Sequence, residues 1–191
     1  AHGVGLLIYV GYGARHGPLH VLVVGGSLGA AALKEVLPRA LALLPESERP
    51  EVVHQSGAQH LESLRLAYEQ AGVRAHAVAF VKDMAGAYEW ADVVICRAGA
   101  LTIAELAAAG VASILVPYPH AVDDHQTGNA RFLALAGAAI LLPQDQLTPE
   151  RLGEIGRLPR QQLVQMAEKA RELARPEATA TVAQACIDIA K

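Results

Sequence analysis

The residues best suited to chemistry lie in a few short glycine-rich or polar stretches. The first is Gly25-Gly26-Ser27-Leu28-Gly29, which fits the G-x-S-x-G pattern of a serine-hydrolase nucleophile. The same stretch is also a glycine turn between a strand-like and a helix-like run, where phosphate groups commonly bind. Ser27 is therefore either a nucleophile or a hydrogen-bond donor to a ligand.

The hydrolase and dinucleotide interpretations fit the surrounding residues poorly. Only 26 residues precede Ser27, whereas a nucleophile elbow follows several strands. Asp124 and His125 are adjacent, so both cannot line up behind one serine. The strict G-x-G-x-x-G pattern of an NAD site is absent, and the second strand-like run ends in His54-Gln55-Ser56 without an acidic residue. We interpret Ser27 as a ligand-contacting hydroxyl.

A second stretch, Arg97-Ala98-Gly99-Ala100-Leu101-Thr102, is followed three residues later by Glu105. Gly99 permits a tight turn, and the amides of Ala100, Leu101 and Thr102 would be unpaired donors at a helix start, which favours phosphate. A carboxylate at Glu105 could accept from ribose hydroxyls. The alternative is a capping box, since T-x-x-E has the required spacing. The two interpretations stay open and do not exclude each other.

A third stretch carries acidic, imidazole and amide side chains: His120, Asp123, Asp124, His125 and Gln126. A metal site is conceivable, but no further histidine or cysteine stands at ligand spacing. We therefore predict no metal and no cofactor. Asp123 or Asp124 could cap the following helix. His125 and Gln126 could bind sugar hydroxyls or belong to an ordinary solvated surface.

These stretches follow apolar runs that predict buried strands. The predicted strands are 19–25, 51–57, 75–81, 91–97 and 112–118, with AAILLP as a last edge strand. Helical spacing predicts helices over 28–44, 59–71, 100–110 and 124–136 and most of 148–190, and KDMAGAYEWA (82–91) is predicted to form a short helix. Pro38 should kink or divide the first helix, Gly72 and Gly110 should end two others, and Pro159 and Pro176 should break the last region.

Regular alternation of strands and helices predicts a doubly wound, mainly parallel α/β sheet of the Rossmann-like type. In such a sheet, ligands lie beyond the carboxyl ends of the strands. The loops after the first, third, fourth and fifth strands should therefore converge on one site. We expect residues 1–17 to be a linker or remnant and residues 18–191 to be one domain.

Composition excludes several classes of protein. Apolar residues make up 52% of the 191 residues and the net charge is −3, without a basic stripe, so nucleic acid is not an expected partner. Cys96 and Cys186 fit no metal or redox spacing, which favours a cytoplasmic setting. No run reaches the ~18 apolar residues of a membrane span. Because the chain starts at Ala1, we expect a fragment or a processed product.

Several motifs together resemble the C-terminal domain of the MurG family. They are VLVVGGSLGA, HQSG, FVKDMAGAYEWADVVICRAGALTIAELAAAG and PHAVDDHQTGNA, and the resemblance covers about residues 13 to 191. MurG proteins are GT-B glycosyltransferases that transfer GlcNAc from UDP-GlcNAc to lipid I, with inversion, to make lipid II in peptidoglycan synthesis. Their C-terminal domain holds the sugar nucleotide.

The resemblance also implies roles for individual residues. Ser27 would contact the diphosphate, Val81 would meet the uracil through its backbone, and Met84 would lie beside it. Ala100, Leu101 and Thr102 would bind phosphate, and Glu105 the ribose hydroxyls. His125 and Gln126 would read the GlcNAc hydroxyls.

The family's N-terminal half, with the lipid I site, the candidate base and the membrane patch, is not found in this sequence. The family's Asn-Pro-Val-Arg segment has no counterpart either, and Arg15 is not assumed to replace its arginine. We expect this chain to bind UDP-GlcNAc without turnover and to hold no catalytic residue. The full-length protein would be peripheral on the cytoplasmic face of the inner membrane. Alternatives are a free-standing UDP-sugar-binding subunit, another GT-B enzyme or a UDP-GlcNAc epimerase.

Overall fold

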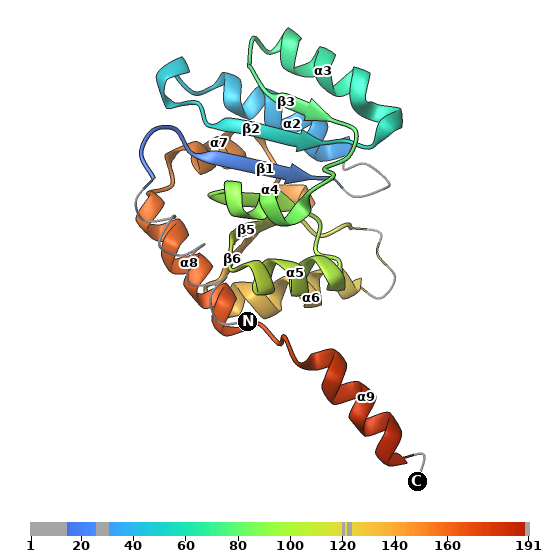
Figure 1. The fold of residues 1–191 in the computed structure, drawn as a ribbon. Coiled ribbons are helices and arrows are strands. Elements are labelled where there is room, and N and C mark those ends of the chain that lie inside the picture. Colours follow the sequence, from blue (N-terminus) through green and yellow to red (C-terminus); the bar gives the residue numbers. More distant parts are fainter. Residues whose placement is uncertain (1–14, 26–30, 120, 122–123, 190–191) are drawn as a thin grey trace.

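The computed structural model of the protein describes residues 15–25, 31–119, 121 and 124–189 (Figure 1). Its centre is a six-stranded sheet in the order β3-β2-β1-β4-β5-β6. The strands are β1 His20–Val24, β2 Glu51–Gln55, β3 His76–Val78, β4 Val93–Cys96, β5 Ala112–Leu115 and β6 Ala139–Leu141. Every neighbouring pair is parallel. The predicted doubly wound α/β class is confirmed.

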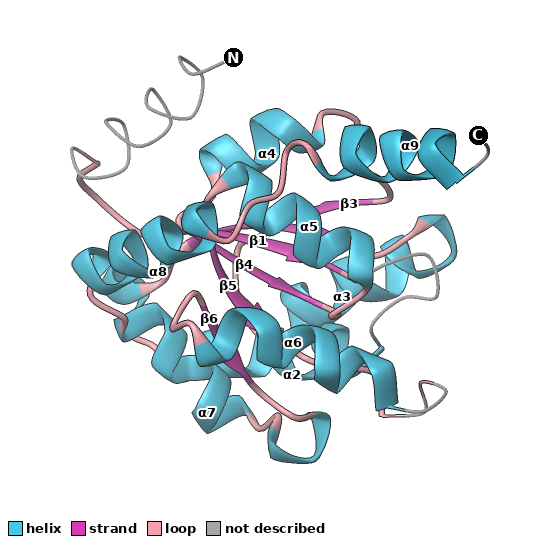
Figure 2. Ribbon diagram, turned by 90° about the horizontal axis from the view of Figure 1, so that it is seen from below, coloured by secondary structure: helices cyan, strands magenta, loops and turns pink. Residues whose placement is uncertain are grey.

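The sheet is buried because helices cover both of its faces (Figure 2). All four residues of β4 and all four of β5 are buried. In β1, Val21 and Val23 belong to one apolar cluster, while Leu22 between them belongs to the other, as the two-residue period of a strand requires. Continuous apolar runs in the sequence thus reflect burial on both faces.

The helices divide between these two clusters. Helices α2 Ala31–Ala42, α3 Leu61–Gln70 and α7 Pro149–Gly153 pack on one face. Helices α4 Met84–Trp90, α5 Ala100–Ala109 and α6 His125–Leu135 pack on the other. Helix α8, Arg160–Glu172, contributes Leu163 and Met166 to the first cluster and Ala170 to the second. Short 3-10 turns occupy Glu46–Glu48, Ala58–His60, Gln144–Gln146 and Glu154–Arg157.

The two glycines that were predicted to end helices do so, whereas Pro38 does not divide its helix. Gly72 and Gly110 adopt left-handed backbone angles at φ 64° and 66° just after α3 and α5, as predicted for helix stops. Pro38 lies inside α2, which continues through it, so the helix is not divided there. Leu33, Leu37 and Leu41 are buried with Pro38 against the sheet. Burial of this face offsets the hydrogen bond that a proline cannot donate.

The strands are shorter than the apolar runs that predicted them. The run 75–81 gives only the three residues of β3, and 112–118 gives the four of β5. The backbone beyond the strands still pairs for one or two residues, as in Ser56 N–H to Val78 O and Gly57 N–H to Ala79 O. The residues after these last bonds turn away from the sheet and form the loops where ligands bind in such folds.

The C-terminal region is helical with breaks at Pro159 and Pro176, as predicted. The last helix, α9 Ala178–Ile189, extends away from the rest of the domain (Figure 1). Within the described residues, no helix combines the length and apolar composition needed to cross a bilayer.

The strand order reverses direction between β1 and β4. From β1 the chain proceeds to β2 and β3 on one side, then returns to β4 next to β1 and continues to β5 and β6. In open parallel sheets, a crevice opens beyond the carboxyl ends of the strands at such a switch point. The loop that follows β4 flanks it here, and the residues after Gly25 lie outside the described part of the chain.

Candidate functional site at the carboxyl edge of the sheet

Helix α5 begins at this switch point without a side-chain cap. Gly99 is its N-cap residue, with φ −64° and ψ 147°, and no side chain accepts from the first turn. The first intrahelical bond runs from Ile103 N–H to Gly99 O. The amides of Ala100, Leu101 and Thr102 precede that bond, and they carry the positive end of the helix dipole. The arrangement suits an anion.

The capping-box interpretation of Thr102 and Glu105 is wrong. Thr102 is the third residue inside α5, not its N-cap, so Glu105 stands in the second turn. A capping box requires the threonine before the helix begins. The neighbouring helices show the contrast: Asp83 caps α4 by accepting from Gly86 N–H, and Thr148 caps α7 by accepting from Arg151 N–H.

Glu105 is exposed, and a tyrosine holds one of its oxygens. Tyr88 Oη donates to Glu105 Oε2 at 3.0 Å. The tyrosine ring is buried, with 7% of its surface exposed. Burial, and then the charge and hydrogen bond of Glu105, raise the pKa of Tyr88 above its ordinary value, so the hydroxyl stays protonated. Burial, aided by Glu105, also raises the pKa of Cys96 to about 12, leaving an inert thiol.

Val81 and Met84 lie in the loop after β3 and at the start of α4. Both are half-buried against the apolar cluster that contains Tyr88. The backbone N–H of Val81 donates to Gln55 Oε1 at 2.9 Å. Gln55 ends β2, and its own carbonyl accepts from Gly25 N–H. Gln55 therefore ties the loop after β3 to the ends of β1 and β2.

Gln126 and Asn129 fasten the start of α6 to the loop after β4. Gln126 Oε1 accepts from the backbone amides of Ala98 and Tyr118, at 3.3 and 3.0 Å. Asn129 Nδ2 donates to Ala98 O at 3.0 Å. Because the Gln126 oxygen is engaged, this side chain offers its NH₂ group, and not its oxygen, to a ligand.

The residue directly before α6 has an unusual backbone. Asp124 precedes the helix at φ 52° and ψ 28°, the left-handed region that non-glycine residues seldom adopt. Its carboxylate accepts from the Thr127 hydroxyl at 2.6 Å and caps no backbone amide. His125, the first residue of α6, is exposed. Such backbone strain is concentrated at functional sites in folded proteins.

Arg97 supports the loop that leads from β5 to α6. Its guanidinium donates to the carbonyls of Val116 and Pro117 and to Gln144 Oε1, and it lies over the Tyr118 ring at 5.5 Å. Burial lowers the pKa of Arg97 from its ordinary value, while Tyr118 opposes that shift. Because the guanidinium donates to backbone carbonyls, it holds this loop in place at the carboxyl edge.

Three candidate residues lie outside the described part of the chain: Ser27, His120 and Asp123. Among the residues that are described, no group of three histidine, cysteine or acidic side chains could hold a metal ion. Val81, Met84, Glu105 and the start of α5 come together on one side of the switch point, since α4 packs against α5. Gln126 reaches the same loop from the other side through Ala98.

The opposite, amino edge of the sheet holds a different polar cluster. Asp92, directly before β4, has no exposed side-chain surface and accepts from Arg15 at 3.0 Å, Arg160 at 2.9 Å and His20 N–H at 2.8 Å. Burial by itself raises the pKa of Asp92, but these donors outweigh it and the pKa lies below its ordinary value. Arg15 thus binds away from the carboxyl edge and does not reach it.

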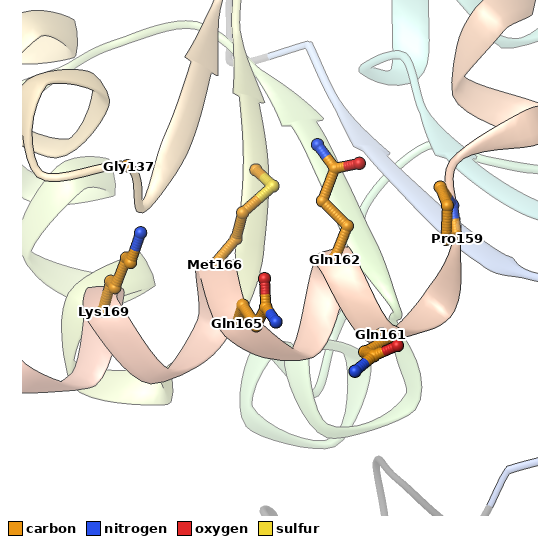
Figure 3. A pocket seen from close by; sticks show the side chains of 7 residues that line it. All are labelled: Gly137, Pro159, Gln161, Gln162, Gln165, Met166 and Lys169. Atoms are coloured by element: carbon orange, nitrogen blue, oxygen red, sulfur yellow. The ribbon is translucent and has the colours of Figure 1, made fainter.

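A hollow of about 540 Å³ also lies on this side of the domain (Figure 3). It is lined by Gly137, before β6, and by residues of α8 and its start: Pro159, Gln161, Gln162, Gln165, Met166 and Lys169. It is wide open, and no charged side chain in it is deeply buried. None of the residues that line this hollow belongs to α5 or to the loop before it.

Sequence reasoning missed the residues that hold the candidate ligand-binding residues in place. Tyr88, Gln55, Arg97 and Asn129 act through contacts across 17 to 47 residues of sequence. Gln55 had one usable signal, since it is a polar residue at the carboxyl end of a strand. Tyr88 had none, because one tyrosine in a short amphipathic helix is typical of core packing.

Comparison with known proteins relates this geometry to glycosyltransferases. The model of the glycosyltransferase family 28 C-terminal domain matches residues 20–185. A curated UDP-N-acetylglucosamine–N-acetylmuramyl-(pentapeptide) pyrophosphoryl-undecaprenol N-acetylglucosamine transferase from Dechloromonas aromatica (strain RCB) is 64% identical over 180 residues, which cover 94% of this chain and 51% of that protein. The protein of the same name from Marinobacter nauticus is 56% identical, with 92% and 49% covered. The chain spans about half the length of these relatives.

Solved structures agree. The crystal structure of MurG from Acinetobacter baumannii matches with a TM-score of 0.80 and 49% identity, over 86% of this chain and 50% of that one. WaaG, a glycosyltransferase of lipopolysaccharide biosynthesis, matches with a TM-score of 0.64 at 22% identity, over 98% and 51%. At that identity the likeness concerns the fold alone. The six-stranded domain is the Rossmann-like half of a GT-B structure.

Proposed function

This chain belongs to the glycosyltransferase family 28 C-terminal domain family, and from that membership we propose that it is the sugar-nucleotide-binding half of a GlcNAc transferase. The resemblance to MurG predicted from the sequence motifs is confirmed by the relatives. The nucleotide is UDP-GlcNAc, and the complete enzyme transfers GlcNAc to lipid I to form lipid II. The curated relatives carry a name that states this transfer.

The observation that carries the proposal is the uncapped start of α5 next to the Glu105 carboxylate. The diphosphate binds the amides of Ala100, Leu101 and Thr102. One carboxylate oxygen of Glu105, the one that Tyr88 does not hold, accepts from the ribose hydroxyls. A positive helix end and an adjacent carboxylate together suit a nucleoside diphosphate better than a free phosphate or a free sugar.

The uracil lies by Val81 and Met84, on the Tyr88 side of the crevice. Gln55 Oε1 accepts from the Val81 N–H, so a base carbonyl that uses this amide must replace the Gln55 oxygen. The GlcNAc lies toward α6, where His125 is exposed and Gln126 presents its NH₂ group. Ser27, which lies outside the described residues, stays a predicted contact of the diphosphate.

In the transfer reaction, the bond between the anomeric carbon and the UDP oxygen breaks and negative charge grows on the diphosphate. The helix dipole and the three amides of α5 stabilise that charge without moving. The nucleophilic oxygen and the base that takes its proton come from the acceptor side. Lipid I and the cytoplasmic face of the membrane are contacted by the other half of the enzyme, so this chain binds UDP-GlcNAc without turnover.

Calorimetric titration of the chain with UDP-GlcNAc, UDP-GalNAc and UDP, each with and without EDTA, tests the proposal. We expect binding that does not depend on EDTA and that favours UDP-GlcNAc over UDP-GalNAc. In Glu105→Ala, UDP affinity should fall by about 10-fold or more, since a charged hydrogen-bond acceptor is removed. Wild-type protein that binds none of the three nucleotides, or an unchanged affinity in Glu105→Ala, would contradict the assignment.

A further inference from the structure

We infer that Tyr88 is a positioning residue that makes this site selective for the ribose 2′-hydroxyl. The inference rests on the proposed function, because it concerns how Glu105 meets the ribose. Its starting point is the hydrogen bond of 3.0 Å from Tyr88 Oη to Glu105 Oε2. Tyr88 is buried and Glu105 is exposed, so the rigid partner is the tyrosine.

An exposed glutamate on a helix samples many rotamers, and a ligand that needs one of them must freeze the rest. Tyr88 removes that cost in advance. Its ring is fixed by the apolar cluster with Leu22, Ile103 and Leu106. The hydroxyl therefore marks a fixed point in space, and a carboxylate that bonds to it has one oxygen placed and the other turned outward.

The tyrosine hydroxyl acts only as a donor here. Burial and the neighbouring Glu105 raise its pKa above the ordinary value, so it keeps its proton at neutral pH. The oxygen that faces the crevice is then an acceptor, which suits a ribose diol and offers nothing to a phosphate.

The helix that carries Tyr88 also carries Met84, four residues earlier. Residues four apart lie on the same face of a helix, and both belong to or pack against the same apolar cluster. Helix α4 thus sets the position of Met84, on the uracil side, and of Glu105, on the ribose side, from a single rigid face. The distance between base and ribose contacts is fixed before the nucleotide arrives.

The test compares UDP with 2′-deoxy-UDP by calorimetry on the 191-residue chain and four variants: Tyr88→Phe, Glu105→Gln, the double variant and Tyr68→Phe. Tyr68 is the matched control, because its ring is also buried and its hydroxyl bonds to His54 on the other face of the sheet. Thermal unfolding of each variant verifies that it is folded.

Wild type should prefer UDP over 2′-deoxy-UDP by about 10-fold, the size expected for one hydrogen bond to a charged group. In Tyr88→Phe, UDP should weaken by about 3- to 10-fold while 2′-deoxy-UDP changes by less than about twofold, so the preference collapses. Tyr68→Phe should keep the full preference. In the Glu105→Gln background, Tyr88→Phe should have no further effect.

Three other outcomes would each contradict a different assignment. If Tyr88→Phe keeps the 2′-hydroxyl preference while Glu105→Gln loses it, Tyr88 is only a core residue and the inference fails alone. If Glu105→Gln keeps the preference, the ribose role of Glu105 fails with it. If wild type does not bind UDP, the proposed function itself is wrong. Should Tyr88→Phe not fold, a structure of the UDP complex decides: Tyr88 Oη must stay within about 3.2 Å of Glu105.

Discussion

The two edges of the parallel sheet treat polar groups in opposite ways. At the amino edge, Asp92 is fully buried and receives two arginines and a backbone amide. At the carboxyl edge, α5 starts without a cap, and Glu105 is held through one oxygen and left exposed. Paired charges hold the protein together at one edge. At the other, polar groups are oriented in advance but left partly unsatisfied, as a ligand site requires.

The largest effect should come from breaking the amino-edge cluster. In Asp92→Asn, the two arginines lose their buried counter-charge, and the free energy of unfolding should fall by about 3 kcal/mol. Urea denaturation measures this loss. The matched control is Glu62→Gln, which removes an exposed carboxylate paired with Arg65 and should change stability by less than about 0.5 kcal/mol. An Asp92→Asn loss of the same small size would refute the structural role of this edge.

The second prediction concerns how stability depends on pH through His54 and through Asp92. His54, near the carboxyl end of β2, is buried beside Tyr68, and burial lowers its pKa to about 3. Below pH 6.5 the unfolded chain binds a proton that the native protein does not, so stability should fall by about 2 kcal/mol between pH 8 and pH 5. The pKa of Asp92 is lowered, so its contribution is present above the unfolded value and is lost only in stronger acid.

Urea denaturation at several pH values measures the His54 contribution. The paired variant His54→Leu, Tyr68→Phe removes the histidine without leaving a tyrosine hydroxyl unpaired. Between pH 8 and pH 5 its stability should fall by about 2 kcal/mol less than that of wild type, because all other groups titrate alike in both. Identical pH profiles would mean that His54 is not kept neutral by burial.

The third prediction concerns α5, which would gain a side-chain cap of the kind that α4 and α7 have. Gly99 has a backbone that any residue adopts, and a Cβ there would make an ordinary contact with Thr102 Oγ1 at 3.6 Å. Gly99→Asp should therefore cap α5 and raise stability by a few tenths of a kcal/mol. The same carboxylate occupies the anion site, so UDP affinity should fall by about 10-fold or more.

Gly99→Asn separates capping from charge in that experiment. It supplies a neutral cap, so its loss of UDP affinity should be clearly smaller than that of Gly99→Asp. Calorimetry with UDP and urea denaturation on the same preparations give both quantities. If Gly99→Asp binds UDP as well as wild type does, the start of α5 does not hold the diphosphate.

The smallest effect concerns Gln126, which serves both the fold and the ligand. Gln126→Glu keeps the oxygens that accept from Ala98 and Tyr118 and loses only the NH₂ group. Stability should stay within about 0.5 kcal/mol, while the preference for UDP-GlcNAc over UDP should shrink by about threefold. Gln70→Glu, at the far end of α3, makes the same charge change and should leave that preference intact. A preserved preference in Gln126→Glu would remove this residue from the sugar site.

The sequence predicted the fold well because burial on both faces leaves a plain signal. The apolar runs at β4 and β5 have no other explanation in a chain of this length. The start of α5 was also predictable, since Gly99 and the residues after it show both the turn and the helix. The sequence did not decide which residue is the N-cap of α5, because T-x-x-E has the spacing of a capping box. Only backbone geometry shows that Thr102 lies inside the helix.

The contacts that position the candidate ligand-binding residues could not be predicted from the sequence, for a physical reason. Tyr88 and Glu105 are 17 residues apart on different helices, and Gln55 and Val81 are 26 apart. No periodicity relates such pairs, because their meeting depends on how two helices or loops pack on the sheet. Pro38 also shows the limit of a local rule: the rule predicts a kink or a division, and the division does not occur because the helix face around Pro38 is buried.

Arg160 has a consequence for how the protein is made. It donates to the carbonyls of Arg15, Gly17 and Pro18, across as many as 145 residues of sequence, and to the carboxylate of Asp92. Chains emerge from the ribosome N-terminus first. The segment that leads into β1 is among the first described residues to appear, and its hydrogen bonds to Asp92 and to the carbonyls of Glu89 and Trp90 become possible once these residues are made. The hydrogen bonds from Arg160 become possible only when α8 has been synthesised. The contacts of this segment are therefore completed in two stages, and the second depends on a residue 145 positions later in the chain.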